Sequence, residues 1–247
     1  MVLFVTAVCN ARCEFCFYWE EIESAKSKLE LTLDEYKQIS CHLKHLYYLS
    51  IGGGEPFTRL DLPQILEAFY RNSSTRTVAI ASHGGFPHRI QNLLSFTQTH
   101  YPSLKIKLQL SLDNLYERHD QSRKIKGLFD NFLKSCSVIS TMRDQGANCM
   151  LTIATVLTTE NLDHISSIKK FVDEHISYDD LSLIYPRGAA KDKNLLQVNA
   201  SEYRKIKELF EATTHAHNFY TKLHREIDKE GKKGVESYLE HGKNGYP

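Results

Sequence analysis

The sequence lacks any apolar run long enough to cross a bilayer, and its apolar start, Met1-Val2-Leu3-Phe4, is too short for the core of a secretion signal. It also lacks an excess of charge of one sign, because 31 Lys and Arg residues balance 30 Asp and Glu residues. No strong overall field therefore favours nucleic acid or an anionic membrane as a partner. We expect neither kind of partner.

Cysteine is scarce, with 6 residues in a chain of 247. Such a low content does not indicate a disulfide scaffold, and reduced thiols are typical of the cytosol, so we expect a cytoplasmic protein. Hydrophobic residues make up 41% of the chain, which is enough to fill a substantial core. The length allows one large domain, or a domain with a small appendage.

Three of these cysteines lie close together in the sequence. Cys9, Cys13 and Cys16 form a C-x3-C-x2-C array directly after a short apolar run. Thiolates grouped this tightly favour zinc, copper(I) or an iron–sulfur cluster. A 4Fe–4S cluster normally takes four cysteines, so three would leave one iron open to a reactant.

A closed zinc site is the main competing interpretation, because structural zinc usually takes four protein ligands. No nearby His completes such a set, and the next cysteine, Cys41, falls well inside a predicted helix. We therefore predict a cluster with an open site. A zinc-binding protein and a non-catalytic iron–sulfur protein are the alternatives.

Strand and helix signals alternate along the first 185 residues. A capping box at Thr32–Glu35 opens one of the helices, and three glycines end the second strand. The pattern predicts strands at 3–6, 47–51, 77–81, 104–112, 149–157 and 181–185. It predicts helices at 32–46, 62–70, 88–100, 127–145 and 161–175.

Six strand–helix repeats imply an α/β fold with a parallel sheet. A complete eightfold barrel needs about 250 residues. The repeats end earlier, so we expect a partial TIM barrel, (β/α)6. We assign residues 1–190 to this core and 191–247 to a C-terminal helical extension with two charged helices between 201 and 240.

Polar and glycine residues recur where the predicted strands end. The cysteines follow the first strand, Gly53-Gly54-Glu55 the second, Ser82 ends the third, and Ser111 and Asp113 end the fourth. Ligands of parallel α/β sheets gather at the carboxyl ends of the strands. These groups should therefore converge on one rim.

Together the motifs resemble those of the radical S-adenosylmethionine (SAM) superfamily. The cysteine array with Phe15 is similar to its C-x3-C-x-aromatic-C, and Gly53-Gly54-Glu55-Pro56 to its G-G-E-P. Ser82-His83-Gly84 resembles its T-N-G step. Ser111-Leu112-Asp113, followed by His119-Asp120-Gln121-Ser122-Arg123, resembles its S-x-D and H-D-x-x-R pair.

The resemblance implies two cofactors, one 4Fe–4S cluster on Cys9, Cys13 and Cys16, and SAM. In this superfamily the reduced cluster cleaves SAM to a 5′-deoxyadenosyl radical, which abstracts hydrogen from a substrate. We therefore expect an oxidoreductase or transferase acting on a small molecule or peptide. Its electron donor would be a protein such as flavodoxin or ferredoxin.

The resemblance also implies eight residues that bind SAM: Phe15, Gly53, Gly54, Glu55, Ser82, Ser111, Asp113 and Arg123. The glycines would let the backbone approach the methionyl part. Glu55 would accept hydrogen bonds from the ammonium group, and Arg123 would offset the carboxylate. Asp113 or Ser111 suits the ribose hydroxyls, and Phe15 offers an apolar face near adenine.

The chain departs from the family pattern at several points. Asn114 replaces the Gly that usually follows S-x-D, and Lys124 the Gly that often follows H-D-x-x-R. Relatives of the SPASM or twitch type often carry a cysteine-rich C-terminal extension, whereas no cysteine follows Cys149 here. The protein either works with one cluster or is a shortened form of something longer.

Substrate specificity is expected further round the same rim, from Tyr185 to Gly188 and in the C-terminal helices. Arg187 would bind a carboxylate or phosphate, or else be a water-exposed linker residue.

Overall fold

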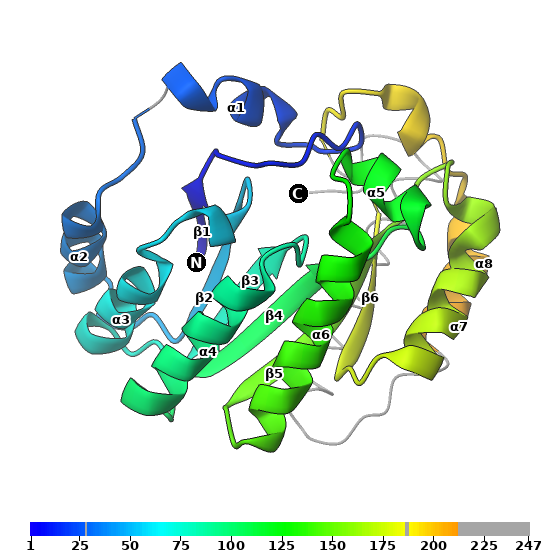
Figure 1. The fold of residues 1–247 in the computed structure, drawn as a ribbon. Coiled ribbons are helices and arrows are strands. Elements are labelled where there is room, and N and C mark those ends of the chain that lie inside the picture. Colours follow the sequence, from blue (N-terminus) through cyan, green and yellow to red (C-terminus); the bar gives the residue numbers. More distant parts are fainter. Residues whose placement is uncertain (28, 186–187, 212–247) are drawn as a thin grey trace.

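The computed structural model describes residues 1–27, 29–185 and 188–211. Its centre is one parallel sheet of 6 strands that lie side by side in chain order. The strands are β1 Val2–Thr6, β2 Tyr48–Gly53, β3 Thr77–Ser82, β4 Lys105–Ser111, β5 Cys149–Val156 and β6 Asp180–Ile184. The sheet curves without closing, which confirms the predicted partial barrel (Figure 1).

Helices α2 Leu33–His42, α3 Leu62–Asn72, α4 Pro87–His100, α6 Leu128–Asp144 and α7 Ile165–His175 lie between successive strands and cover the outer face of the sheet (Figure 1). Two short helices, α1 Trp19–Glu23 and α5 Glu117–Arg123, lie near the carboxyl ends of the strands, and α8 Ala200–Glu211 follows β6. Short 3-10 turns lie at Ala25–Ser27, Pro56–Thr58, Leu162–His164 and Lys193–Leu196.

The five helices predicted from the sequence are all present, with shifted ends. The capping box of α2 forms as expected: Thr32 Oγ1 accepts from Glu35 N–H, and the Glu35 carboxylate accepts from Thr32 N–H. The short helices α1 and α5 were not predicted, because each is shorter than the two turns that a periodic pattern needs. Of the two charged helices expected after residue 200, α8 is present, and the remainder lies outside the described residues.

The two faces of the sheet differ in polarity, as β4 illustrates. Its outward side chains, Ile106, Leu108 and Leu110, are fully buried in the core that the sheet shares with the helices. The alternate residues of the strand, Lys105, Lys107, Gln109 and Ser111, are half-buried on the concave face. A complete barrel fills its interior with branched apolar side chains. The concave side of β4 is instead polar.

The end of β2 differs from the expectation. Glycines were predicted to stop the strand, but β2 continues through Gly53, which pairs with Thr6 of β1. Gly53 has φ +118°, and a Cβ there would lie 2.3 Å from the Thr6 carbonyl oxygen. A Cβ on Gly54 would lie 2.3 Å from the Val8 carbonyl oxygen. The glycines therefore allow β2 to lie directly against the backbone that carries the cysteines.

We predict that Gly54→Ala destabilises the protein by about 1–3 kcal/mol, because the clash is with backbone that cannot move freely. The Val8 carbonyl oxygen also accepts the Glu55 N–H at 2.9 Å, so its displacement would break that bond. Gly52→Ala is the matched control, since its Cβ would meet only the Phe4 side chain at 3.5 Å. Urea unfolding measures both variants. Equal stability of the two would contradict this account of Gly54.

Candidate cluster and cofactor site

The cysteines lie on the loop after β1, which crosses the carboxyl ends of the strands (Figure 1). Cys13 is buried and Cys9 and Cys16 are half-buried, in a small apolar cluster with Phe15 and Leu195. Backbone N–H groups donate to two of the sulfur atoms, from Ala11 to Cys9 Sγ at 3.3 Å and from Tyr18 to Cys16 Sγ at 3.4 Å. The loop thus orients these sulfur atoms through its own backbone.

Burial sets the protonation of these thiols. It raises the pKa of Cys9 to about 11 and that of Cys13 to about 12, because the thiolate is poorly solvated there. The thiols are therefore protonated at neutral pH, and any metal that binds them must displace the protons. Among the other cysteines, Cys41 is exposed on α2, and Cys136 and Cys149 are buried in the core below the rim.

Within the described part of the chain, no three His, Cys, Asp or Glu side chains form a group that could hold a metal ion as the side chains stand. Zinc usually takes four protein ligands around one ion, whereas a 4Fe–4S cluster takes one cysteine for each iron. The chemistry of the donor set, three thiols on one loop, fits a 4Fe–4S cluster with one iron left open.

Glu55 is almost fully buried, and its carboxylate already has donors within the protein. It accepts hydrogen bonds from Phe57 N–H at 3.0 Å, from the Ser82 hydroxyl at 2.9 Å and from His83 N–H at 2.9 Å. A carboxylate offers about four acceptor positions. The structure thus brings Glu55 and Ser82 together, and Glu55 joins the ends of β2 and β3.

His83 was part of the predicted Ser82-His83-Gly84 step but was given no role of its own, and it extends this network to the cysteine loop. Its Nδ1 accepts from Gly85 N–H at 2.9 Å, so its Nε2 carries the proton. Nε2 lies 2.8 Å from Asn10 Oδ1 and 3.3 Å from the Glu55 carboxylate. Burial lowers the pKa of His83, which keeps the ring neutral. Asn10 directly follows Cys9, so His83 links the carboxylate to the cysteine loop.

Asp113 and Arg123 form a buried ion pair. Asp113 Oδ2 accepts from Arg123 Nε at 2.7 Å and lies 2.6 Å from Nη2, while Oδ1 accepts from Val156 N–H at 3.0 Å. The Arg123 guanidinium also lies 5.6 Å from the centre of the Phe15 ring. The backbone carbonyl oxygen of Arg123 accepts from Arg12 N–H. Both charges that were expected to meet SAM are thus neutralised by each other.

Asn161 is a second residue that sequence reasoning missed. It is fully buried, and its Nδ2 donates to the carbonyl oxygens of Asp113 at 2.9 Å and Val156 at 2.8 Å. Its Oδ1 accepts from Thr158 N–H at 2.9 Å. This side chain therefore joins the ends of β4 and β5. The sequence feature that could have pointed to Asn161 was its position shortly after a predicted strand. Asn is common in loops, so this position alone indicates no role.

Glu30 and Arg59 anchor the start of the cysteine loop. The Glu30 carboxylate accepts from the Thr6 hydroxyl at 2.5 Å and from Ala7 N–H at 3.0 Å. Arg59 Nη1 lies 4.0 Å from that carboxylate and donates to the Val5 carbonyl oxygen at 3.0 Å. The loop is thus held at its first residues by side chains from two later segments.

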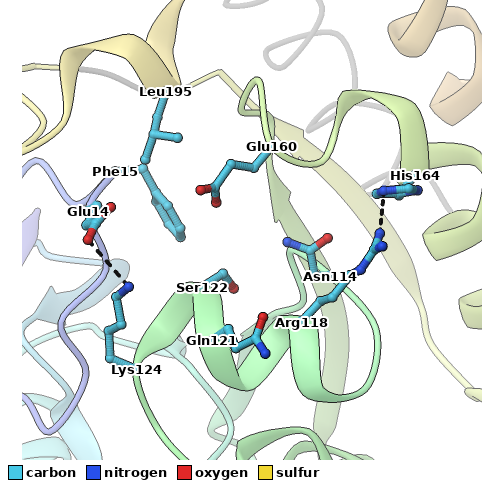
Figure 2. A pocket seen from close by; sticks show the side chains of 10 residues that line it. All are labelled: Glu14, Phe15, Asn114, Arg118, Gln121, Ser122, Lys124, Glu160, His164 and Leu195. Atoms are coloured by element: carbon cyan, nitrogen blue, oxygen red, sulfur yellow. Dashed lines mark hydrogen bonds and ion pairs between the residues drawn. The ribbon is translucent and has the colours of Figure 1, made fainter.

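Two predicted residues remain available for a ligand. Ser111 is half-buried on the concave side of β4, and its hydroxyl has no hydrogen bond to any described residue. Phe15 borders a cavity of about 410 Å³ beside α5 (Figure 2).

Comparison with known proteins agrees with the resemblance that the sequence motifs showed. A model of the Radical SAM superfamily matches residues 3–172. GTP 3′,8-cyclase of Edwardsiella ictaluri is 37% identical over 87 residues, which is 33% of this chain and 26% of that protein. No membrane-spanning helix is found among the residues described.

Two solved structures share the fold. SuiB of Streptococcus suis bound to S-adenosylmethionine superposes with a TM-score of 0.61 at 18% identity, over 84% of this chain and 45% of that chain. The structure of anSMEcpe with bound AdoMet superposes with a TM-score of 0.60 at 20% identity, over 85% of this chain and 58% of that chain. The chain thus spans about half the length of these structures and a quarter of the curated relative. Since the family match covers well over half of the sequence, this chain belongs to the radical SAM superfamily.

Proposed function

We propose that Cys9, Cys13 and Cys16 hold one 4Fe–4S cluster, beside which this protein binds SAM. When bound, the cluster supplies the electron that cleaves SAM to a 5′-deoxyadenosyl radical, which then takes hydrogen from a substrate. The observation that carries this proposal is the set of three thiols on one loop at the carboxyl rim. No fourth Cys or His ligand accompanies them among the residues described.

We assign the predicted SAM residues two different tasks. Ser111 and Phe15 would contact SAM directly, because the Ser111 hydroxyl is unengaged and Phe15 borders an open cavity. Gly53 and Gly54 would place backbone groups beside the methionyl part. Glu55 already meets several protein donors, so only a remaining lone pair would reach the ammonium group of SAM.

Ser82, Asp113 and Arg123 would act chiefly by holding the rim in place. Ser82 donates to Glu55, and Asp113 and Arg123 pair with each other. Arg123, which was predicted to offset the carboxylate of SAM, would face that group only as part of its ion pair with Asp113.

The substrate would reach the radical from the polar concave face. Gln109, Ser111 and Thr152 lie there on adjacent strands, with Gln109 and Thr152 in register. They suit a substrate with hydrogen-bonding groups, either a small molecule or a peptide. The similar proteins include a GTP 3′,8-cyclase and anSMEcpe, which was solved in complex with a peptide, so both classes belong in a screen.

The segment after β6 would complete the substrate side. Tyr185 donates to the Leu196 carbonyl oxygen at 3.3 Å and stacks edge-on with Tyr203 of α8. Arg187, for which a role in binding an anionic group was expected, lies outside the described residues. We retain 1–190 as core and 191–247 as extension, a cytoplasmic location, and a flavodoxin or ferredoxin as electron donor.

The decisive experiment is anaerobic reconstitution with iron and sulfide, reduction with dithionite, and measurement of 5′-deoxyadenosine from SAM. Replacing any of Cys9, Cys13 and Cys16 with Ala should remove the visible absorbance of the cluster and abolish 5′-deoxyadenosine. Cys41→Ala is the matched control, because that thiol is exposed and distant from the loop, and it should behave as wild type. An equal requirement for Cys41 would refute the assignment of the ligands.

We further predict that Arg123→Ala lowers the free energy of unfolding by about 3–5 kcal/mol, because it leaves the Asp113 charge buried without a partner. The double variant Arg123→Met/Asp113→Leu should cost less, since it removes both charges. Lys37→Ala, which breaks an exposed ion pair with Asp34, should cause no measurable change. Urea unfolding of the cluster-free protein measures all three, and a negligible effect of Arg123→Ala would contradict this role.

A further inference from the structure

The buried ring of His83 is held rigidly at the end of β3. Its Nδ1 accepts the N–H of Gly85 at 2.9 Å. A Cβ on Gly85 would lie 2.6 Å from the ring carbon Cε1, so the ring fills the space that a side chain at position 85 would need. Because Nδ1 is an acceptor here, the proton is on Nε2, and that nitrogen acts as a donor.

The Nε2–H of His83 is directed at the cysteine loop. Nε2 lies 2.8 Å from Asn10 Oδ1 and 3.3 Å from the Glu55 carboxylate. Asn10 is the residue directly after Cys9, so His83 holds the carboxyl side of this cysteine. On its amino side, the Val8 carbonyl oxygen accepts Glu55 N–H at 2.9 Å. Cys9 is therefore fixed from both sides.

The side held by His83 also provides a hydrogen bond to the thiol. Ala11, the residue after Asn10, donates its N–H to Cys9 Sγ at 3.3 Å. Asn10 stands between the sulfur and this donor in the chain, so its position sets the direction of the Ala11 N–H. If Asn10 lost its bond to His83, the donor would no longer be held on the sulfur.

A hydrogen bond to a cysteine sulfur affects the electron affinity of an iron–sulfur cluster. Reduction potentials of such clusters depend on the hydrogen bonds that their sulfur atoms accept. The partial positive charge of a donor stabilises the additional electron of the reduced state. Losing the donor therefore makes a cluster harder to reduce.

We infer that His83 is a positioning residue for the cluster, because through Asn10 it holds the N–H that meets Cys9 Sγ. It thereby raises the reduction potential of a cluster bound there. The inference rests on the proposed function. The link is particular to this chain, because the position resembles the Asn of the T-N-G step. An asparagine side chain ends at about the position of Nδ1, so it would still meet Gly85 N–H but would not span to Asn10.

Two substitutions separate the two ends of the ring. His83→Asn keeps an acceptor near Nδ1 and loses the donor at Nε2, whereas His83→Gln places an amide N–H near Nε2 and loses the acceptor. The cluster-loaded proteins are reduced stepwise without SAM under anaerobic conditions, and the EPR signal of the reduced cluster gives the midpoint potential.

His83→Asn should lower the equilibrium constant of reduction about tenfold, as expected for the loss of one hydrogen bond to a charged group. For a one-electron couple this change is a fall of about 59 mV in the midpoint potential. His83→Gln should stay near the wild-type potential, since it keeps the donor toward Asn10.

Two further variants test the link itself. Asn10→Ala breaks it from the other side and should lower the potential as His83→Asn does. Combining the two substitutions should cause no further shift, because both remove one interaction. His88→Asn is the matched control, since that exposed histidine takes part in none of these bonds, and it should leave the potential unchanged. If His83→Asn fails to fold, the potential of Asn10→Ala decides.

The outcomes separate this inference from the proposed function. Unchanged potentials in His83→Asn and Asn10→Ala, or an equal shift in His83→Gln, would overturn the inference and leave the cluster assignment standing. So would variants whose cluster-free form is less stable in urea while the potential stays constant, because that result indicates a purely structural role. Wild-type protein that takes up no cluster would overturn the proposed function and this inference together.

Discussion

The buried ion pair between Asp113 and Arg123 is the interaction on which the rim depends. Asp113 stands directly after β4 and accepts the Val156 N–H at the end of β5, and Arg123 ends α5. The Arg123 backbone accepts Arg12 N–H, and its guanidinium lies over Phe15. One ion pair therefore joins two strands and a helix to the loop that carries the cysteines. Two charges this deeply buried are tolerated because each supplies the other's partner.

Glu55 joins the ends of β2 and β3, as Asp113 joins the ends of β4 and β5. Its carboxylate collects donors from both strand ends, and His83 continues the network to Asn10 beside Cys9. The cysteine loop is thus attached to the sheet at two places by buried carboxylates. A loop that carries three neighbouring thiols benefits from such fixed supports, because loop backbone is otherwise mobile.

The open sheet explains why the concave face differs from the interior of a closed barrel. The helices among the described residues cover the outer face, so the apolar half of each strand is buried there and the other half faces inward. With six strands the sheet does not close, and polar residues such as Gln109 and Thr152 need not pack against branched side chains from the opposite wall.

The sequence by itself determined the strand order, the partial barrel and the location of the cysteines, because periodicity and short motifs are local properties. It also indicated which residues meet at the rim, since parallel strands bring their carboxyl ends together. It did not reveal the partners of those residues. That Asp113 pairs with Arg123, that His83 links Glu55 to Asn10, and that Asn161 joins the ends of β4 and β5, depends on distances between segments far apart in the chain. Only the tertiary structure decided these, because the same side chain binds a ligand or a neighbour according to what lies within about 3 Å of it.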